Sequence, residues 1–121
     1  MAGTTCGTGF RPGERIRRRA EFQRVYEKGY RSHGRLSTIF LLANGGLTGR
    51  LGVAATRKLG GAVVRNRAKR LIREVFRRNK IAGFDVVVVP KRELLDATLT
   101  ALETEFRQTI ERRLRQLRRT G

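Results

Sequence analysis

The sequence predicts an α/β domain in which helices pack on a small sheet, and three observations lead to this prediction. Apolar residues recur at helical spacing in several segments, alternate at strand spacing in another, and form a continuous β-branched run near residue 88. A chain of 121 residues is long enough for one modest core and too short for two. We expect a single domain over residues 15–121, preceded by a flexible tail over residues 1–14.

The first elements are a short helix and a short strand. Phe22, Val25 and Tyr26 are spaced for one helix face, and Gly29 provides a natural end to that helix. A short strand is expected around residues 30–35.

A hairpin is predicted next. The segment LSTIFLLA, residues 36–43, alternates Ile39 and Leu41 against Thr38 and Phe40 and is rich in β-forming residues, as strands are. The Asn-Gly turn signal in NGGLTG, residues 44–49, implies that the next segment returns as the paired strand, over residues 50–56.

The second half predicts a helix, a strand and a second helix. An amphipathic helix is expected over roughly residues 63–79, with an apolar stripe made of Val64, Ala68, Leu71, Ile72, Val75 and Phe76. The run FDVVVVP, residues 84–90, is typical of a strand covered on both faces. Apolar residues at helical spacing then predict one long final helix that contains Leu95, Leu99, Leu102, Phe106, Ile110, Leu114 and Leu117.

The charge balance indicates a polyanionic partner. The chain has 28 Lys and Arg against 10 Asp and Glu, a formal net charge of +18. Nucleic acid is favoured over an anionic membrane surface, because it is the more common partner of a small basic domain. A membrane-spanning helix is not expected, because the longest apolar run, TIFLLA, is far too short to span a bilayer. The single cysteine, Cys6, is interpreted as an incidental thiol, and together with the absence of a signal peptide it favours the cytoplasm.

The helix over residues 63–79 carries most of this signal. On a helical wheel its basic and amide side chains lie opposite or beside the apolar stripe: Arg65, Asn66, Arg67, Lys69, Arg70, Arg73 and Arg77. Only the i,i+4 pairs of Glu74 with Arg70 and Arg78 have opposite signs. Arginine suits bidentate phosphate contacts, so polyanion binding is favoured over a solvated face kept for solubility.

Three aromatic residues could stack on bases. Phe22 and Tyr26 share a helix face, and Phe40 lies on the strand, with basic residues nearby in the sequence. Aromatic side chains in a positive groove hold single-stranded nucleic acid. From spacing alone, however, aromatic residues at helical positions are more often core, so both interpretations stay open.

Catalytic groups are not apparent in the sequence. The acidic residues are scattered, and Glu103 and Glu105 are expected to face different ways on the final helix. His33 has no acidic neighbour. We therefore expect a protein that binds without cutting, and neither a catalytic residue nor a metal ligand is predicted.

One long segment identifies a family. RLGVAATRKLGGAVVRNRAKRLIREVFR resembles the hallmark segment of the bacterial ribonuclease P protein family, and EFQRVYEKG and DVVVVPK are similar to its first helix and last strand. The resemblance covers about residues 15–106. It implies a two-layer α/β sandwich of order αβββαβα, with a small mixed sheet and a left-handed crossover around the basic helix.

The resemblance also implies a function. Proteins of this family are subunits of the ribonucleoprotein that removes 5′ leaders from precursor tRNA, in which the RNA subunit, with Mg²⁺, hydrolyses the phosphodiester. The protein strengthens binding of the substrate and of metal ions. The expected partners are ribonuclease P RNA and the 5′ leader of precursor tRNA, with no membrane and no obligate protein partner. A ribosomal or general RNA-packaging protein is the alternative, and a stand-alone endonuclease is disfavoured.

Individual residues match the family's motif. The positions expected to contact the RNA subunit are Lys58, Arg65, Asn66, Arg67, Lys69, Arg70 and Arg73. Phe22, Tyr26 and Phe40 match aromatic positions of the cleft that receives the leader. The chain departs from the family at Gly61, where Asn is usual, and at Arg57, where Lys is common.

Overall fold

The structure, a computed structural model, describes residues 15–79 and 81–120. In this part of the chain the elements are α1 (Arg19–Lys28), β1 (Tyr30–His33), β2 (Ser37–Ala43), β3 (Arg50–Val53), α2 (Ala62–Arg78), β4 (Phe84–Pro90), the 3₁₀ turn η3 (Arg92–Asp96) and α3 (Leu99–Thr120). The order of helices and strands confirms the predicted αβββαβα class. The predicted tail, residues 1–14, and Cys6 within it lie outside the described residues.

The four strands form one mixed sheet in the order β1-β2-β4-β3. Strand β2 runs antiparallel to both β1 and β4, whereas β3 runs parallel to β4. Val86 on β4 lies opposite Leu41 of β2 on one side and Leu51 of β3 on the other. The β3–α2–β4 unit joins adjacent parallel strands, and the left-handed crossover expected for it stays a prediction.

The predicted hairpin between β2 and β3 is wrong, because β4 lies between these two strands. The Asn-Gly turn does form: Asn44 Oδ1 accepts a hydrogen bond from Gly46 N–H at 2.8 Å, and Gly45 has a φ of +71°. The Asn44 amide, however, donates to Asp85 on β4 at 3.0 Å. The continuous apolar run of β4 takes the central position, where both of its edges are paired and both of its faces are covered.

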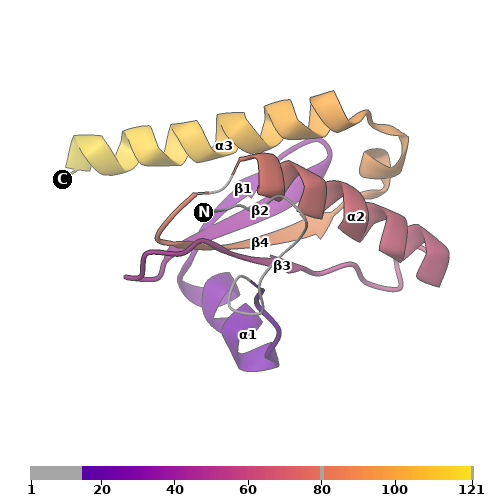
Figure 1. The fold of residues 1–121 in the computed structure, drawn as a ribbon, viewed down its shortest axis with the longest axis horizontal. Helices are drawn as coiled ribbons and strands as arrows, with labels where there is room; N and C mark the ends of the chain where they lie inside the picture. Colours follow the sequence, from indigo (N-terminus) through magenta and orange to yellow (C-terminus); the bar gives the residue numbers. More distant parts are fainter. Residues whose placement is uncertain (1–14, 80, 121) are drawn as a thin grey trace, which may run out of the picture.

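The sheet is covered on both faces (Figure 1). Helices α2 and α3 pack on one face, where the core consists mainly of Ile39, Leu41, Leu51, Val86 and Val88 against Ala68, Ile72, Val75, Phe76, Leu102, Phe106 and Ile110. Helix α1 covers part of the other face, where Val25 packs against Phe40 and Val87. The two predicted layers are therefore present, and α1 adds a short third layer.

The final helix is shorter than predicted. Leu95 lies in η3, and α3 begins only after Thr98, whose hydroxyl oxygen accepts a hydrogen bond from Ala101 N–H at 3.1 Å. A threonine in this position caps a helix start, which the spacing of leucines does not reveal. Leu95 nonetheless packs against the main core, so the apolar pattern extends across the break.

Glu105 of α3 holds the turn between β1 and β2. Its carboxylate accepts hydrogen bonds from the backbone N–H groups of Leu36 and Ser37 and from the Ser37 hydroxyl, at 3.0–3.1 Å. A Cβ at Gly34 would lie 2.5 Å from the Glu105 carboxyl carbon, so a larger residue there would displace the carboxylate from these hydrogen bonds. Glu103 points elsewhere and accepts a hydrogen bond from Asn79, which confirms that the two acids face different ways.

Arg50 links three elements through a charged cluster. Its Nε and Nη2 atoms donate to the Asp85 carboxylate at 2.8 and 2.7 Å, and its Nη1 donates to Glu21 of α1 at 2.9 Å. Asp85 is buried, with 5% of its surface exposed. Burial alone would raise the pKa of Asp85, yet hydrogen bonds from Arg50 and Asn44 outweigh it and lower that pKa overall.

We predict that Arg50→Met lowers the free energy of unfolding at pH 7 by about 2 kcal/mol, because it leaves a buried carboxylate without its charged partner. Because the pKa of Asp85 is lower in the folded state than in the unfolded state, the ionised carboxylate stabilises the fold at every pH above the ordinary aspartate pKa of about 4. This contribution is lost as the pH falls below about 4 and through the folded-state pKa. Urea denaturation between pH 7 and pH 3 should therefore show a smaller acid-side loss in the variant.

Arg78→Met is the matched control, because Arg78 pairs with Glu74 on an exposed helix surface. We expect it to cost less than about 1 kcal/mol. Equal losses from the two variants would contradict the structural role assigned to Arg50.

Candidate nucleic-acid interface

Helix α2 is fixed by its apolar side and presents its basic side to solvent. Ala68, Ile72, Val75 and Phe76 are buried against the sheet and α3. The first intrahelical hydrogen bond runs from Arg65 N–H to the Gly61 carbonyl at 2.9 Å, so the N–H groups before it have no partner within the helix. No side chain caps this end and its first turn has no acid, which leaves the helix N-terminus positive.

The single acidic residue of α2, Glu74, forms its ion pairs near the C-terminal end of the helix. Glu74 pairs with Arg77 and with Arg78, and it makes no ion pair with Arg70, the other residue of opposite sign at i,i+4 spacing. Within the described residues, Arg67 and Arg70 have neither an ion pair nor a side-chain hydrogen bond. Their positive charge is therefore available to an external anion.

The structure divides the predicted RNA-contacting residues between two surfaces. The first, here called the outer face of α2, is a shallow depression of about 410 Å³ lined by Val63, Asn66, Arg67 and Arg70. Three of these residues were predicted from the sequence. Val63 was missed because the prediction rested on charged and amide side chains, although helical spacing puts Val63 on the same side of the helix.

The second surface, here called the junction cavity, has a volume of about 160 Å³ and is lined by Arg15, Ile16, Arg17, Phe22, Leu51, Val53, Lys69 and Arg73. It brings Lys69 and Arg73 of α2 next to Phe22 of α1. Arg15 and Arg17 were not predicted as site residues: only the pairing of the chain before α1 with β3, through Ile16 N–H and the Leu51 carbonyl at 2.9 Å, places them there.

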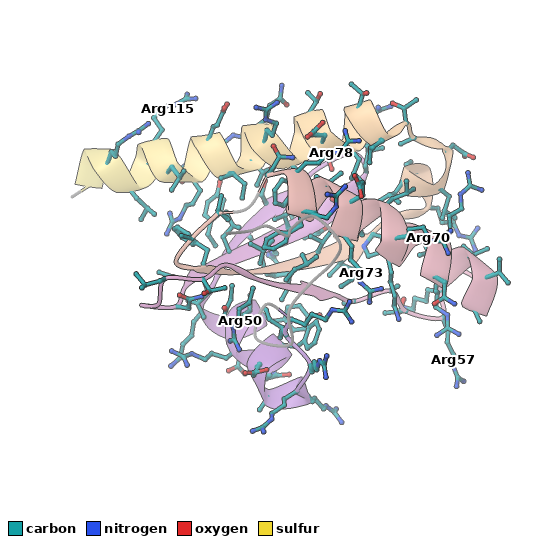
Figure 2. The ribbon with its side chains drawn as sticks, viewed as in Figure 1. Arg50, Arg57, Arg70, Arg73, Arg78 and Arg115 are labelled. Atoms are coloured by element: carbon teal, nitrogen blue, oxygen red, sulfur yellow. The ribbon has the colours of Figure 1, made fainter. Side chains whose placement is uncertain are left out.

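The junction cavity concentrates like charges. Burial, followed by repulsion from the Arg15 guanidinium, lowers the pKa of Arg73. Arginine remains charged at neutral pH in any case, so the consequence is a local repulsion that a bound phosphate would relieve. Figure 2 shows Arg73 pointing from α2 toward the sheet, whereas Arg57 projects outward near the start of that helix.

Arg65 and Lys58 complete the predicted set. Arg65 is half-buried, and its Nε atom is buried without a hydrogen-bond partner, so only the outer part of its guanidinium can reach a ligand. Lys58 is exposed in the turn before α2, which is closed by a hydrogen bond from Leu59 N–H to the Thr56 carbonyl at 3.0 Å. Both residues therefore lie beside the first turns of α2.

The three predicted aromatic residues form one cluster on the α1 side of the sheet. The ring centroids of Tyr26 and Phe40 are 4.9 Å apart in an edge-to-face arrangement, and those of Phe22 and Tyr26 are 6.3 Å apart. Phe40 is 9% exposed and belongs to the small core, whereas Tyr26 is 37% exposed. Gly52 makes room for Phe22, because a Cβ there would lie 2.8 Å from the ring.

Several acidic side chains are engaged in structural contacts. Glu21 and Asp85 bind Arg50, Glu74 binds Arg77 and Arg78, and Glu105 holds the β1–β2 turn. Among residues 15–79 and 81–120, no group of three or more His, Cys, Asp or Glu side chains could hold a metal ion. His33 is exposed on β1, within 3.2 Å of the Thr38 hydroxyl.

None of the helices in the described part of the chain combines the length and the apolar composition that a membrane-crossing helix requires.

Comparison with known proteins gives one consistent result. The family model described as Ribonuclease P matches residues 10–114. A ribonuclease P protein component of Desulfovibrio desulfuricans is 44% identical over 90 residues, which cover 70% of this chain and 69% of the relative. One from Staphylococcus aureus is 33% identical over 100 residues, covering 80% and 87%.

Solved structures agree with the sequence relatives. The ribonuclease P protein of Staphylococcus aureus superposes with a TM-score of 0.71 at 32% identity, covering 81% of this chain and 93% of that protein. The ribonuclease P protein of Thermotoga maritima gives a TM-score of 0.73 at 31% identity, covering 82% and 96%.

The N-cap of α2 generates a prediction. Gly61 has a φ of −73°, and a Cβ there would meet nothing within 4 Å, so any side chain fits. We expect Gly61→Asn to raise the free energy of unfolding by a few tenths of a kcal/mol, because asparagine caps a helix start better than glycine does. Thermal denaturation followed by circular dichroism measures this change.

The neighbouring glycine is the control. Gly60 has a φ of +150°, and a Cβ there would lie 3.0 Å from the Val64 side chain. Gly60→Asn should therefore lower the melting temperature. If both substitutions changed stability in the same direction, the assignment of Gly61 as a sterically open cap would be wrong.

Proposed function

The chain belongs to the ribonuclease P protein family, and from this membership we propose that it acts as the RNA-binding protein subunit of ribonuclease P. In this proposal it binds ribonuclease P RNA and assists the removal of the 5′ leader from precursor tRNA. The observation that carries the proposal is the basic side of α2, where Arg67 and Arg70 have no carboxylate partner in the described chain while Glu74 is taken by other arginines.

The outer face of α2 is assigned to the RNA subunit. Arg67 and Arg70 offer planar guanidinium groups for phosphate, and Asn66 offers an amide for a base edge or a ribose hydroxyl. The uncapped N-terminus of the helix adds a favourable potential for the same phosphates. Lys58 and Arg65, beside the first turns, extend this contact.

The 5′ leader is assigned to the aromatic cluster and the junction cavity. Tyr26 exposes part of its ring for stacking, and Phe22 lies between it and the cavity that Lys69 and Arg73 line. A tyrosine hydroxyl is neutral at physiological pH, and burial raises the pKa of Tyr26 further, so this hydroxyl can donate a hydrogen bond. Phe40 supports the Tyr26 ring from the core rather than binding a base itself.

Catalysis is assigned to the RNA subunit together with Mg²⁺. The engagement of Glu21, Glu74, Asp85 and Glu105 by protein groups supports this assignment, because a carboxylate held by arginine or backbone N–H is poorly placed to ligate a metal. The role of the protein is then to strengthen binding of the precursor and of the metal ions that the RNA holds.

A reconstitution tests the proposed function. Purified protein, ribonuclease P RNA and precursor tRNA are combined at low Mg²⁺, and leader release is followed on a gel. We expect release at a useful rate only when RNA and protein are both present. Cleavage by the protein alone would indicate a stand-alone endonuclease, and no stimulation of the RNA would favour a ribosomal or general RNA-binding protein.

Tyr26→Ala separates leader binding from core packing. Because Tyr26 is partly exposed, we expect its loss to weaken binding of precursor tRNA to the reconstituted complex by about fivefold to tenfold, as for one stacked base, and to leave mature tRNA unaffected. Phe40→Ala, in contrast, should lower the melting temperature strongly. Equal effects of Tyr26→Ala on both tRNAs, measured by filter binding, would rule out a contact with the leader.

A further inference from the structure

Val63 is an apolar residue in an unexpected place. It lies in the first turn of α2 with 83% of its surface exposed, while the other apolar residues of the helix, apart from the small and exposed Ala62, face the core or its border. Valine is a mediocre helix former, and its exposure contributes nothing to the packing of α2. Within this chain it is therefore a poor choice for stability alone.

The neighbours of Val63 are the residues of the proposed RNA contact. Val63, Asn66, Arg67 and Arg70 are spaced i, i+3, i+4 and i+7, and together they line the depression on the outer face of α2. The side chains that surround this apolar group are thus an amide donor and acceptor and two guanidinium groups without carboxylate partners in the described chain.

A nucleotide matches this combination of groups. Its phosphate complements the two arginines, its base edge or 2′-hydroxyl complements the amide, and the face of its ribose or base is a flat surface that a valine can cover. A second copy of this strongly basic chain would instead bring more positive charge to the same surface. Charge complementarity therefore favours RNA as the occupant.

We propose that Val63 makes an apolar contact with an unstacked nucleotide of the ribonuclease P RNA, in the depression formed with Asn66, Arg67 and Arg70. This inference rests on the proposed function and adds to the affinity for RNA a contribution that does not come from charge. The arginines supply affinity that depends on salt, whereas Val63 supplies affinity that does not, because no counterion is released when an apolar group is buried.

Affinity for the cognate ribonuclease P RNA is measured by filter binding between 0.1 and 0.5 M salt. We expect Val63→Ser to weaken binding by about fivefold with an unchanged salt slope, and Val63→Ile to bind as the parent protein does. Arg70→Ala should weaken binding and reduce the slope by about one. Leu47→Ser is the matched control, because Leu47 is 94% exposed and lies before β3, at the opposite end of that strand from α2.

The outcomes separate the two proposals. If Arg70→Ala weakens binding and Val63→Ser does not, the apolar contact is wrong and the RNA-binding function stands. If neither variant weakens binding, the assignment of the outer face to this RNA is wrong as well. Because Val63 is exposed, an equal melting temperature of Val63→Ser and the parent protein is expected and excludes misfolding as the cause of a loss.

A cross-link identifies the occupant directly. Val63→Cys and Leu47→Cys are made in a Cys6→Ser background, and each thiol receives the same short photoreactive group. We expect the group at residue 63 to attach to a few nucleotides of the RNA, outside its continuous helices, and the group at residue 47 to attach to none. Attachment of the residue 63 probe to a second protein copy would overturn the proposal.

Discussion

Strand β4 is the element on which the rest of the fold depends, because Val86, Val87 and Val88 are buried on both faces of the sheet. A strand of this kind needs a neighbour at each edge and a cover on each face. Strands β2 and β3 supply the edges, α2 and α3 cover one face, and α1 covers the other. The parallel pairing of β3 with β4 requires a connection that passes over the sheet, and α2 is that connection. The basic helix is therefore held by the core along its length.

The two sides of α2 have opposite effects on the stability of the free protein. Its buried side stabilises the fold through Ala68, Ile72 and Phe76, whereas its basic side destabilises the free protein through repulsion between arginines that lack carboxylate partners in the described chain. Several acids are engaged in the scaffold instead: Asp85 anchors Arg50, and Glu105 holds the β1–β2 turn. Local attractions thus secure the scaffold, and the unneutralised charge is left on the surface assigned to RNA.

Much of the fold could be predicted from the sequence, and the failures have physical causes. Helical spacing located α2 to within one residue at each end, and the β-branched run located β4. The pairing of β2 with β3 was wrong because an Asn-Gly turn specifies only a reversal of the chain, while the partner of each strand is chosen by burial of β4. The break before α3 was missed because it depends on one capping hydroxyl, that of Thr98.

The sequence predicts those residues of the candidate site that are charged or carry an amide, and it does not predict those that stand out only by their exposure. Asn66, Arg67 and Arg70 stand out by residue type and spacing, and the structure places them together. Val63 has the helical spacing of the basic side but an apolar side chain, so charge does not single it out, whereas its exposed surface in the structure does. Likewise, Phe22 and Arg73 are distant in the sequence, and only the fold brings them to one cavity, which Leu51 and Val53 of β3 also line.

The net charge of +18 should make folding and the proposed binding of RNA respond to salt in opposite directions. Added salt screens like charges within the free protein and so favours its compact state. The same salt weakens every contact with a phosphate. Under the proposed function, bound RNA would counter the same repulsion between like charges, and a ligand that binds only the folded chain stabilises it by mass action. In the cell the RNA subunit would then stabilise the folded state of this protein as well as bind it. The abundance of the protein would depend on that of the RNA.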